Sequence, residues 1–184
     1  MKTTKKVKGF TLIELIVVIA IIGVLAAILV PTMLGYVRKS KISSINTAAS
    51  NVYKAINSAL TELDEEGIDV SGLFIVKYDG SAWSTDDSSS DLLEDNLGEN
   101  SKFDKKVENF FASISKVKSA KAQLDGGACV AVAVAQDKTY TGTYPTGVVT
   151  NETYKDYSMT SGEVPDAALT DACEKAKWTA STED

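Results

Sequence analysis

Histidine is absent from this 184-residue chain, and only two cysteines occur. Without His there is no imidazole metal ligand, no Ser-His-Asp or Cys-His catalytic group, and no side chain that ordinarily titrates near neutral pH. Two cysteines alone are too few for a structural zinc site, which takes four Cys or His ligands. The sequence therefore excludes the most familiar enzyme classes, and we expect no catalytic site, no metal and no cofactor.

Basic charge is also scarce outside the first eight positions. The chain has 19 basic and 25 acidic residues, a net charge of −6, and four of the lysines lie in that N-terminal stretch. The remainder carries 15 basic and 25 acidic residues, a net charge of −10. Because an acidic surface repels phosphate backbones, the sequence makes no strong case for nucleic acid as a partner.

Long apolar runs are confined to one place. Residues 15–30 carry no charge, only Gly23 interrupts the aliphatic series, and extension back to Phe10 adds Thr11 and Glu14. Twenty-one residues at helical rise span about 31 Å, close to the hydrocarbon thickness of a bilayer. The pattern predicts a membrane-spanning helix. A cleaved secretory signal is the alternative, but its apolar core is usually only about 7 to 15 residues long.

The flanking charges bear on orientation. A lysine-rich leader precedes the apolar run, which favours an N-terminus inside the cell, whereas Arg38, Lys39 and Lys41 beyond the run weaken the asymmetry. We expect an extracytoplasmic C-terminal part.

Glu14 is the one charged residue within the apolar segment 10–30, and a membrane-spanning helix does not by itself account for it. A charged carboxylate costs on the order of a few kcal/mol at the bilayer centre and less near the interface. Either Glu14 reaches the lipid headgroups from its shallow position, or another molecule supplies a positive charge. Both readings remain open on physical grounds alone.

Gly9, Phe10, Thr11 and Glu14, with the basic leader before them and Pro31 beyond the apolar run, stand at the spacing typical of type IV pilins. The first 36 or so residues resemble that family. The resemblance implies that a prepilin peptidase/N-methyltransferase cuts between Gly9 and Phe10 and methylates the new Phe10 amine. It also implies that Glu14 pairs with the Phe10 amine of a neighbouring subunit.

Such pairing would set the register of assembly. A misregistered subunit leaves a buried charge unpaired, at a cost of about 3 to 5 kcal/mol. The resemblance further implies that the helix loosens between Gly23 and Pro31 in a filament. The alternative is the ordinary tolerance of transmembrane helices for Gly and Pro.

Beyond the apolar run the pattern becomes one-sided. Apolar residues recur at three- and four-residue steps from Tyr36 to about Asp64, which predicts an amphipathic continuation of the same helix, ended by Gly67. The core face comprises Ile42, Ile45, Ala49, Val52, Ile56, Leu60 and Leu63.

The remaining elements predict an antiparallel sheet with further helices. We expect strands at 73–78, 128–135, within 138–149 and at 153–159, and helices at 90–97, from 100 or 101 to 117, and from Pro165 onward. In the strand 128–135, alternation places Cys129 with Ala131, Ala133 and Ala135 on one face. The fold class is α+β, a long N-terminal helix packed on an antiparallel sheet.

Two local patterns are weaker. The polar stretch 81–90, which carries Asp86 and Asp87 with Asp91 just beyond, matches no defined Ca²⁺ loop and is predicted to be a solvated loop. Asn151 begins a glycosylation pattern short enough to arise by chance.

The two cysteines, Cys129 and Cys173, lie on the extracytoplasmic side in this topology, so we expect a disulfide between the strand 128–135 and the C-terminal helix. Many pilins similarly join a C-terminal region by a disulfide. The alternative is two buried thiols.

The sequence hypothesis is a precursor with a leader at 1–9, a membrane and filament-core half-helix at 10–35, and a head at 36–184. The resemblance implies a surface filament for adhesion, aggregation or motility, a homopolymer assembled from the cytoplasmic membrane by an assembly platform and motor ATPase. The alternatives are a pseudopilin of a type II secretion system and a membrane-anchored binding domain that never polymerises.

Overall fold

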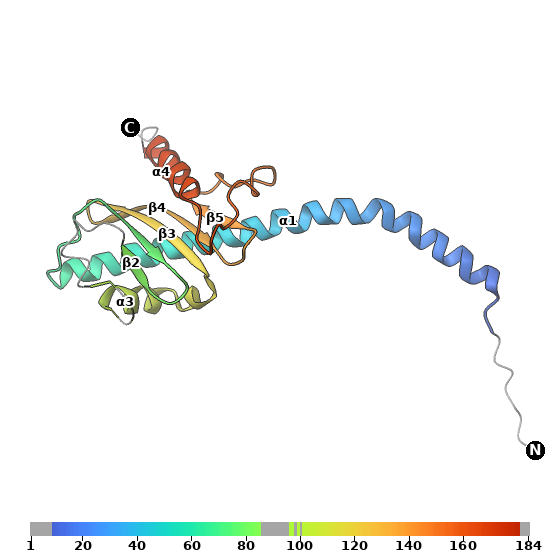
Figure 1. The fold of residues 1–184 in the computed structure, drawn as a ribbon, viewed down its shortest axis with the longest axis horizontal. Coiled ribbons are helices and arrows are strands. Elements are labelled where there is room, and N and C mark those ends of the chain that lie inside the picture. Colours follow the sequence, from blue (N-terminus) through green and yellow to red (C-terminus); the bar gives the residue numbers. More distant parts are fainter. Residues whose placement is uncertain (1–8, 86–95, 98, 100, 181–184) are drawn as a thin grey trace, which may run out of the picture. The chain divides into compact units, whose positions relative to one another are not determined.

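The computed structural model describes residues 9–85, 96–97, 99 and 101–180 (Figure 1). Its elements are α1 (Leu12–Glu65), β1 (Phe74–Tyr78), β2 (Trp83–Thr85), α3 (Lys102–Phe110), the 3₁₀ helix η1 (Ala112–Lys116), β3 (Ser119–Asp125), β4 (Ala128–Ala135), β5 (Thr141–Tyr144) and α4 (Asp166–Ala180). Contacts divide the chain into two compact units, Met1–Arg38 and Lys39–Asp184, so that α1 contributes to both.

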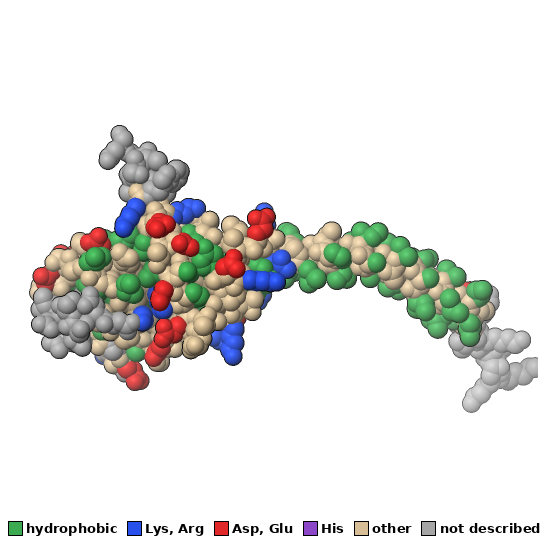
Figure 2. Space-filling view, turned by 45° about the horizontal axis from the view of Figure 1, so that its top comes forward, with side chains coloured by type: hydrophobic (Ala, Val, Ile, Leu, Met, Phe, Trp, Pro, Cys, Tyr) green, Lys and Arg blue, Asp and Glu red, His purple; other side chains and the backbone are tan. Residues whose placement is uncertain are grey.

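Among the described residues, the first unit consists of Gly9 to Thr11 and the N-terminal part of α1. Hydrophobic side chains cover this part of the helix on the face seen in Figure 2. No residue from Leu12 to Leu34 is buried, because no other described element packs on them. The predicted membrane-spanning segment is thus helical, but none of its side chains from Leu12 to Leu34 is buried within the described part of the chain.

The second unit, the head, is built on a five-stranded antiparallel sheet of order β2-β1-β3-β4-β5. A two-residue turn at Gly126 and Gly127 joins β3 to β4, and both glycines have positive φ, 58° and 82°. Glycine adopts such angles without a Cβ penalty, which is why this pair makes a tight hairpin.

One face of the sheet packs on α1 and α3. The second half of α1 buries a stripe of residues at three- and four-residue spacing, and α3 adds Phe103 and Val107. Ser101 caps α3, since its Oγ accepts from the Asp104 N–H at 3.1 Å. The predicted core residues of α1 are all buried: Ile42, Ile45, Ala49, Val52, Ile56, Leu60 and Leu63.

Two asparagines and one glycine hold α1 close to the sheet. The Oδ1 of Asn46 accepts from the Thr143 N–H at 2.9 Å, and the Oδ1 of Asn57 accepts from the Cys129 N–H at 3.0 Å. A Cβ on Gly142 would overlap the carbonyl group of Ile45 and the backbone nitrogen of Asn46. The helix and β5 are therefore in backbone contact at this position, and only glycine fits there.

The other face of the sheet packs on α4. Ala131, Ala133 and Ala135 of β4 meet Leu169 and Ala172 of α4 in a separate core. The small alanine side chains allow α4 to approach the sheet closely, as the alternation of alanine and valine in β4 predicts. The α+β class with the long helix on an antiparallel sheet is confirmed.

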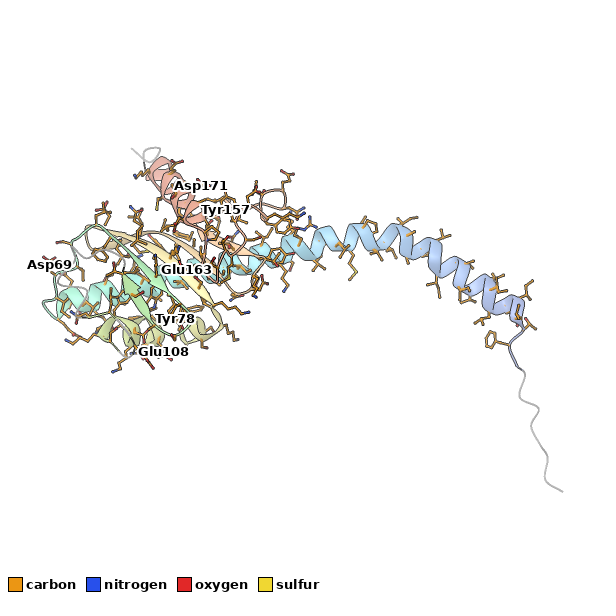
Figure 3. All side chains as sticks on the ribbon, viewed as in Figure 1. Asp69, Tyr78, Glu108, Tyr157, Glu163 and Asp171 are labelled. Carbon is orange, nitrogen blue, oxygen red and sulfur yellow. The ribbon has the colours of Figure 1, made fainter. Side chains whose placement is uncertain are left out.

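Polar contacts tie α4 and the preceding loop to the sheet. The side chain of Lys121 is only 5% exposed, and its Nζ lies 2.7 Å from Asp166 Oδ1 and 3.2 Å from Glu163 Oε2. The hydrogen bond from Lys121 holds the pKa of Asp166 below its ordinary value. The Tyr157 hydroxyl donates to Asp171 Oδ2 at 2.6 Å, which raises the pKa of Tyr157 to about 12 (Figure 3).

The structure corrects several predicted elements. Residues 153–157 form turns and residues 158–159 no regular structure, rather than a strand, because Tyr154 N–H donates to the Thr150 carbonyl and Asp156 N–H to that of Thr153. Residues 83–85, predicted as loop, form the edge strand β2. The helix predicted from 100 or 101 to 117 is divided: its first part is α3, which ends at Phe110, and its second part is the 3₁₀ helix η1. The central strand β3 was not predicted, and most of the predicted helix 90–97 lies outside the described residues, as do Asp86, Asp87 and Asp91.

The predicted disulfide between Cys129 and Cys173 is not formed, since both cysteines are free, buried thiols. A β-bulge explains this. Gln123 pairs with Ala131, but Leu124 pairs with Cys129, so Val130 is an extra residue on β4. This one-residue shift in register places Cys129 in the core between the sheet and α1. Cys173 packs in the core between the other face of the sheet and α4. Burial raises the pKa of both thiols.

Candidate assembly site at the N-terminal segment

The predicted cleavage point lies immediately before α1. Gly9, Phe10 and Thr11 are outside the helix, which begins at Leu12. The Phe10 side chain is 86% exposed, and no atom lies within 4 Å of where a Cβ on Gly9 would be. No other described residue covers the Gly9–Phe10 peptide bond, as access by a peptidase requires.

Glu14 has a local role that the sequence interpretation missed. The Thr11 N–H and the Thr11 hydroxyl donate to Glu14 Oε2 at 2.9 and 2.6 Å, and the Glu14 N–H donates to Thr11 Oγ1 at 3.4 Å. This reciprocal pair is a capping box, which satisfies two N–H groups at the start of the helix. The spacing Thr-x-x-Glu before an apolar run is the signal that would have identified it.

The capping box orients the carboxylate but does not neutralise it. Both hydrogen bonds end on the same oxygen, Oε2, and Glu14 forms no ion pair with any residue that the structure describes. A positive charge for Glu14 would have to come from outside the described part of this chain. The pairing of Glu14 with a Phe10 amine remains a prediction.

The apolar surface that follows Glu14 has no cover within the chain. An 18-residue window of α1 reaches a mean hydropathy of 3.2 and is 0% buried, and this helix is long and apolar enough to cross a membrane. Soluble monomers rarely expose so large a contiguous apolar surface. Lipid or other copies of an apolar helix must cover it.

Gly23 and Pro31 lie inside α1, and the helix continues through both. No atom is within 4 Å of where a Cβ on Gly23 would be, so packing within the chain does not require a glycine there. Pro31 has no N–H for the Ala27 carbonyl, which removes one hydrogen bond from the helix. Helix loosening between the two remains a prediction.

The sequence of the N-terminal segment is similar to that of known proteins. The protein-family model described as the prokaryotic N-terminal methylation motif matches residues 4–30. The chain is 38% identical over 87 residues to the type IV major fimbrial protein FimA of Dichelobacter nodosus, covering 46% of this chain and 54% of FimA. No solved structure matches.

Two further relatives are similar over shorter regions. The type IV major pilin protein PilA of Myxococcus xanthus is 46% identical over 57 residues, which cover 31% of this chain and 26% of PilA. The type IV major alpha-pilin of Moraxella bovis is 47% identical over 55 residues, 30% of this chain and 35% of the relative. The chain thus spans about half the length of these relatives or less. Its N-terminal segment carries the methylation motif, and the chain resembles the type IV major pilins.

Proposed function

We propose that this chain is the structural subunit of a type IV pilus, made as a precursor with a leader at 1–9. Residues 10–35 would form the filament core, and residues 36–184 the head. The observation that carries the proposal is the methylation motif at 4–30 joined to a helix whose apolar surface is uncovered. The named relatives are pilins and fimbrial proteins, which disfavours the pseudopilin and the non-polymerising anchored domain.

Processing would create the charge that Glu14 lacks. Water cleaves the Gly9–Phe10 peptide bond, leaving a carboxylate on Gly9 and an amine on Phe10, and methylation of that amine keeps it positively charged. Thr11 already holds Glu14 Oε2. The carboxylate is thereby oriented while its other oxygen can accept from the Phe10 amine of a neighbouring subunit. Register follows because an offset subunit would leave both charges unpaired in an apolar core.

Assembly would exchange lipid for neighbouring helices. Since both are apolar, the hydrophobic effect contributes little to this step, and helix packing together with the charge pair must favour it. We therefore expect the subunit to begin in the cytoplasmic membrane and to need an assembly platform and a motor ATPase to leave it. Its role is structural rather than enzymatic, in a surface filament serving adhesion, aggregation or motility.

The test is the N-terminal mass of the mature protein together with electron microscopy of sheared cell-surface material. We expect a chain that begins at N-methylated Phe10 and filaments that contain it. Glu14→Gln should be cleaved normally and yield few or no filaments, because the amide carries no charge. Thr11→Val, the matched control, removes the cap but keeps the carboxylate and should retain more filaments. A mature chain beginning at Met1 or near Ile28 would contradict the proposal.

A further inference from the structure

A groove runs along the head half of α1, beside the loop that follows β5. Its volume is about 590 Å³, and no acidic residue is among those that line it. We call it the lysine groove. Its lining includes Lys39, Lys54, Ser50, Asn51, Thr146 and Gly147.

Neither of the two lysines forms an ion pair within the described part of the head. Lys102, Lys106 and Lys121 each form an ion pair, whereas Lys39 and Lys54 form none with any residue that the structure describes. They are exposed and stand about 22 Å apart along the helix axis. A groove with an unpaired ammonium near each end is a local positive site on an otherwise acidic molecule.

Acidic residues gather where α1 ends and in the loops beside it. Asp64 and Glu65 end α1, Asp69 lies in the loop that follows, and Asp125 lies at the β3–β4 turn. These elements lie together, since a Cβ on Gly127 would be 3.5 Å from Val70 Cγ2. All four side chains are exposed and form no ion pair with a described residue. We call these four residues the acidic tip; Asp69 is labelled in Figure 3.

The acidic tip and the lysine groove of one head cannot meet. Lys39 and Lys54 lie on the same continuous helix as Glu65, about 39 Å and about 16 Å from it along the axis. In a filament, however, all subunits point the same way, so a contact between neighbours joins one surface of one copy to a different surface of the next copy. Two patches of opposite charge at separate places along one head are what such a contact requires.

We propose that the lysine groove of one subunit receives the acidic tip of a second copy in the assembled filament. This inference rests on the proposed function and adds to it the head surfaces that join. In such a contact a tip carboxylate of one subunit forms an ion pair with a groove lysine of the next. Neither group has an ion-pair partner among the described residues of its own head. The complementary charges would add specificity for the correct stagger between heads, as charged interfaces generally do.

The test is charge reversal in the full chain, with filaments quantified from cells that contain equal amounts of processed subunit. Lys39→Glu with Lys54→Glu, and separately Asp64→Lys with Glu65→Lys, should each lower filament yield at least about tenfold, since like charges then face one another. The four substitutions together should restore most of the yield. Lys41→Glu with Lys116→Glu is the matched control, because both lysines are exposed and neither lines the groove.

Three results would overturn the inference: normal yield from either reversed pair, no recovery when the two pairs are combined, or an equal loss in the control. None of these touches the proposed function, which fails if the wild-type chain makes no filaments or if its mature form does not begin at Phe10. Equal processed-subunit amounts exclude a folding defect as the cause of a lost filament.

Discussion

The two halves of α1 differ in what covers their aliphatic side chains. From Leu12 to Val37 every large hydrophobic side chain is at least 43% exposed. From Ile42 to Leu63 the apolar stripe is almost completely buried against the sheet. One continuous helix therefore contains a half that folds on its own chain and a half whose apolar surface must be covered by something else.

The polar residues of the two halves differ in the same way. In the head half, Asn46 and Asn57 bond to strand backbone, and Gly142 admits the helix backbone. In the N-terminal half, the Glu14 carboxylate bonds to Thr11 and to no other described residue, and a Cβ on Gly23 would meet no atom beyond its own stretch of helix. Glu14 and Gly23 therefore make no contact with a distant described part of the chain, and such residues are candidates for contacts between chains.

The largest expected effect comes from making the same substitution in both halves. Gly142→Ala places a Cβ in contact with the backbone of Ile45 and Asn46 and should destabilise the head by about 3 kcal/mol, at the upper end of overpacking. Gly23→Ala meets no atom and should leave the head unchanged while favouring the helix by up to about 1 kcal/mol. Thermal melting of the full chain in detergent, followed by circular dichroism, measures both. Equal melting temperatures would contradict the assigned contact.

A smaller effect is expected from Asp166→Asn, which removes one partner of the buried Lys121 ammonium. Glu163 remains, and both carboxylates are open to solvent, so we expect a loss of about 1 kcal/mol at neutral pH. Because the pKa of Asp166 is lower in the folded than in the unfolded state, its contribution is present above about pH 4 and is lost as the pH falls through the folded value.

Melting temperatures of both proteins across this acidic range measure the effect. The wild type and Asp166→Asn should converge as the pH falls, with Glu163 and Lys77 as the other charged groups nearby. A constant difference between the two proteins at all pH values would show that the Asp166 charge is not responsible. Asp171→Asn is the control on the same helix, since Asp171 bonds Tyr157 instead of Lys121.

The smallest effect is expected from reductant. Because Cys129 and Cys173 are free and lie in different cores, reduction should not change the melting temperature of the head. A maleimide reagent should label two thiols per chain only after unfolding, since both are buried in the native state. A melting temperature that drops with reductant would show a disulfide and contradict the bulged register of β4.

Periodicity alone predicted the elements with strong patterns. The core face of α1, the strand β4 and the helix α4 all repeat at the spacing of their own secondary structure, and each is present. By contrast, β3 reads Ser-Ala-Lys-Ala-Gln-Leu-Asp, a run with little β propensity, and becomes a strand only because β1 and β4 pair with it on both sides. Long-range pairing of this kind leaves no local signal.

The sequence by itself determined the N-terminal motif, the length of the apolar helix and the change to a one-sided pattern near residue 40, because these depend on spacing along one helix. Only the tertiary structure decided that Cys129 and Cys173 lie in separate cores, that Lys121 is buried between two carboxylates, and that Lys39 and Lys54 border a groove. Those facts depend on a one-residue slip between strands and on which segments meet in space, and neither is written in the periodicity of any single element.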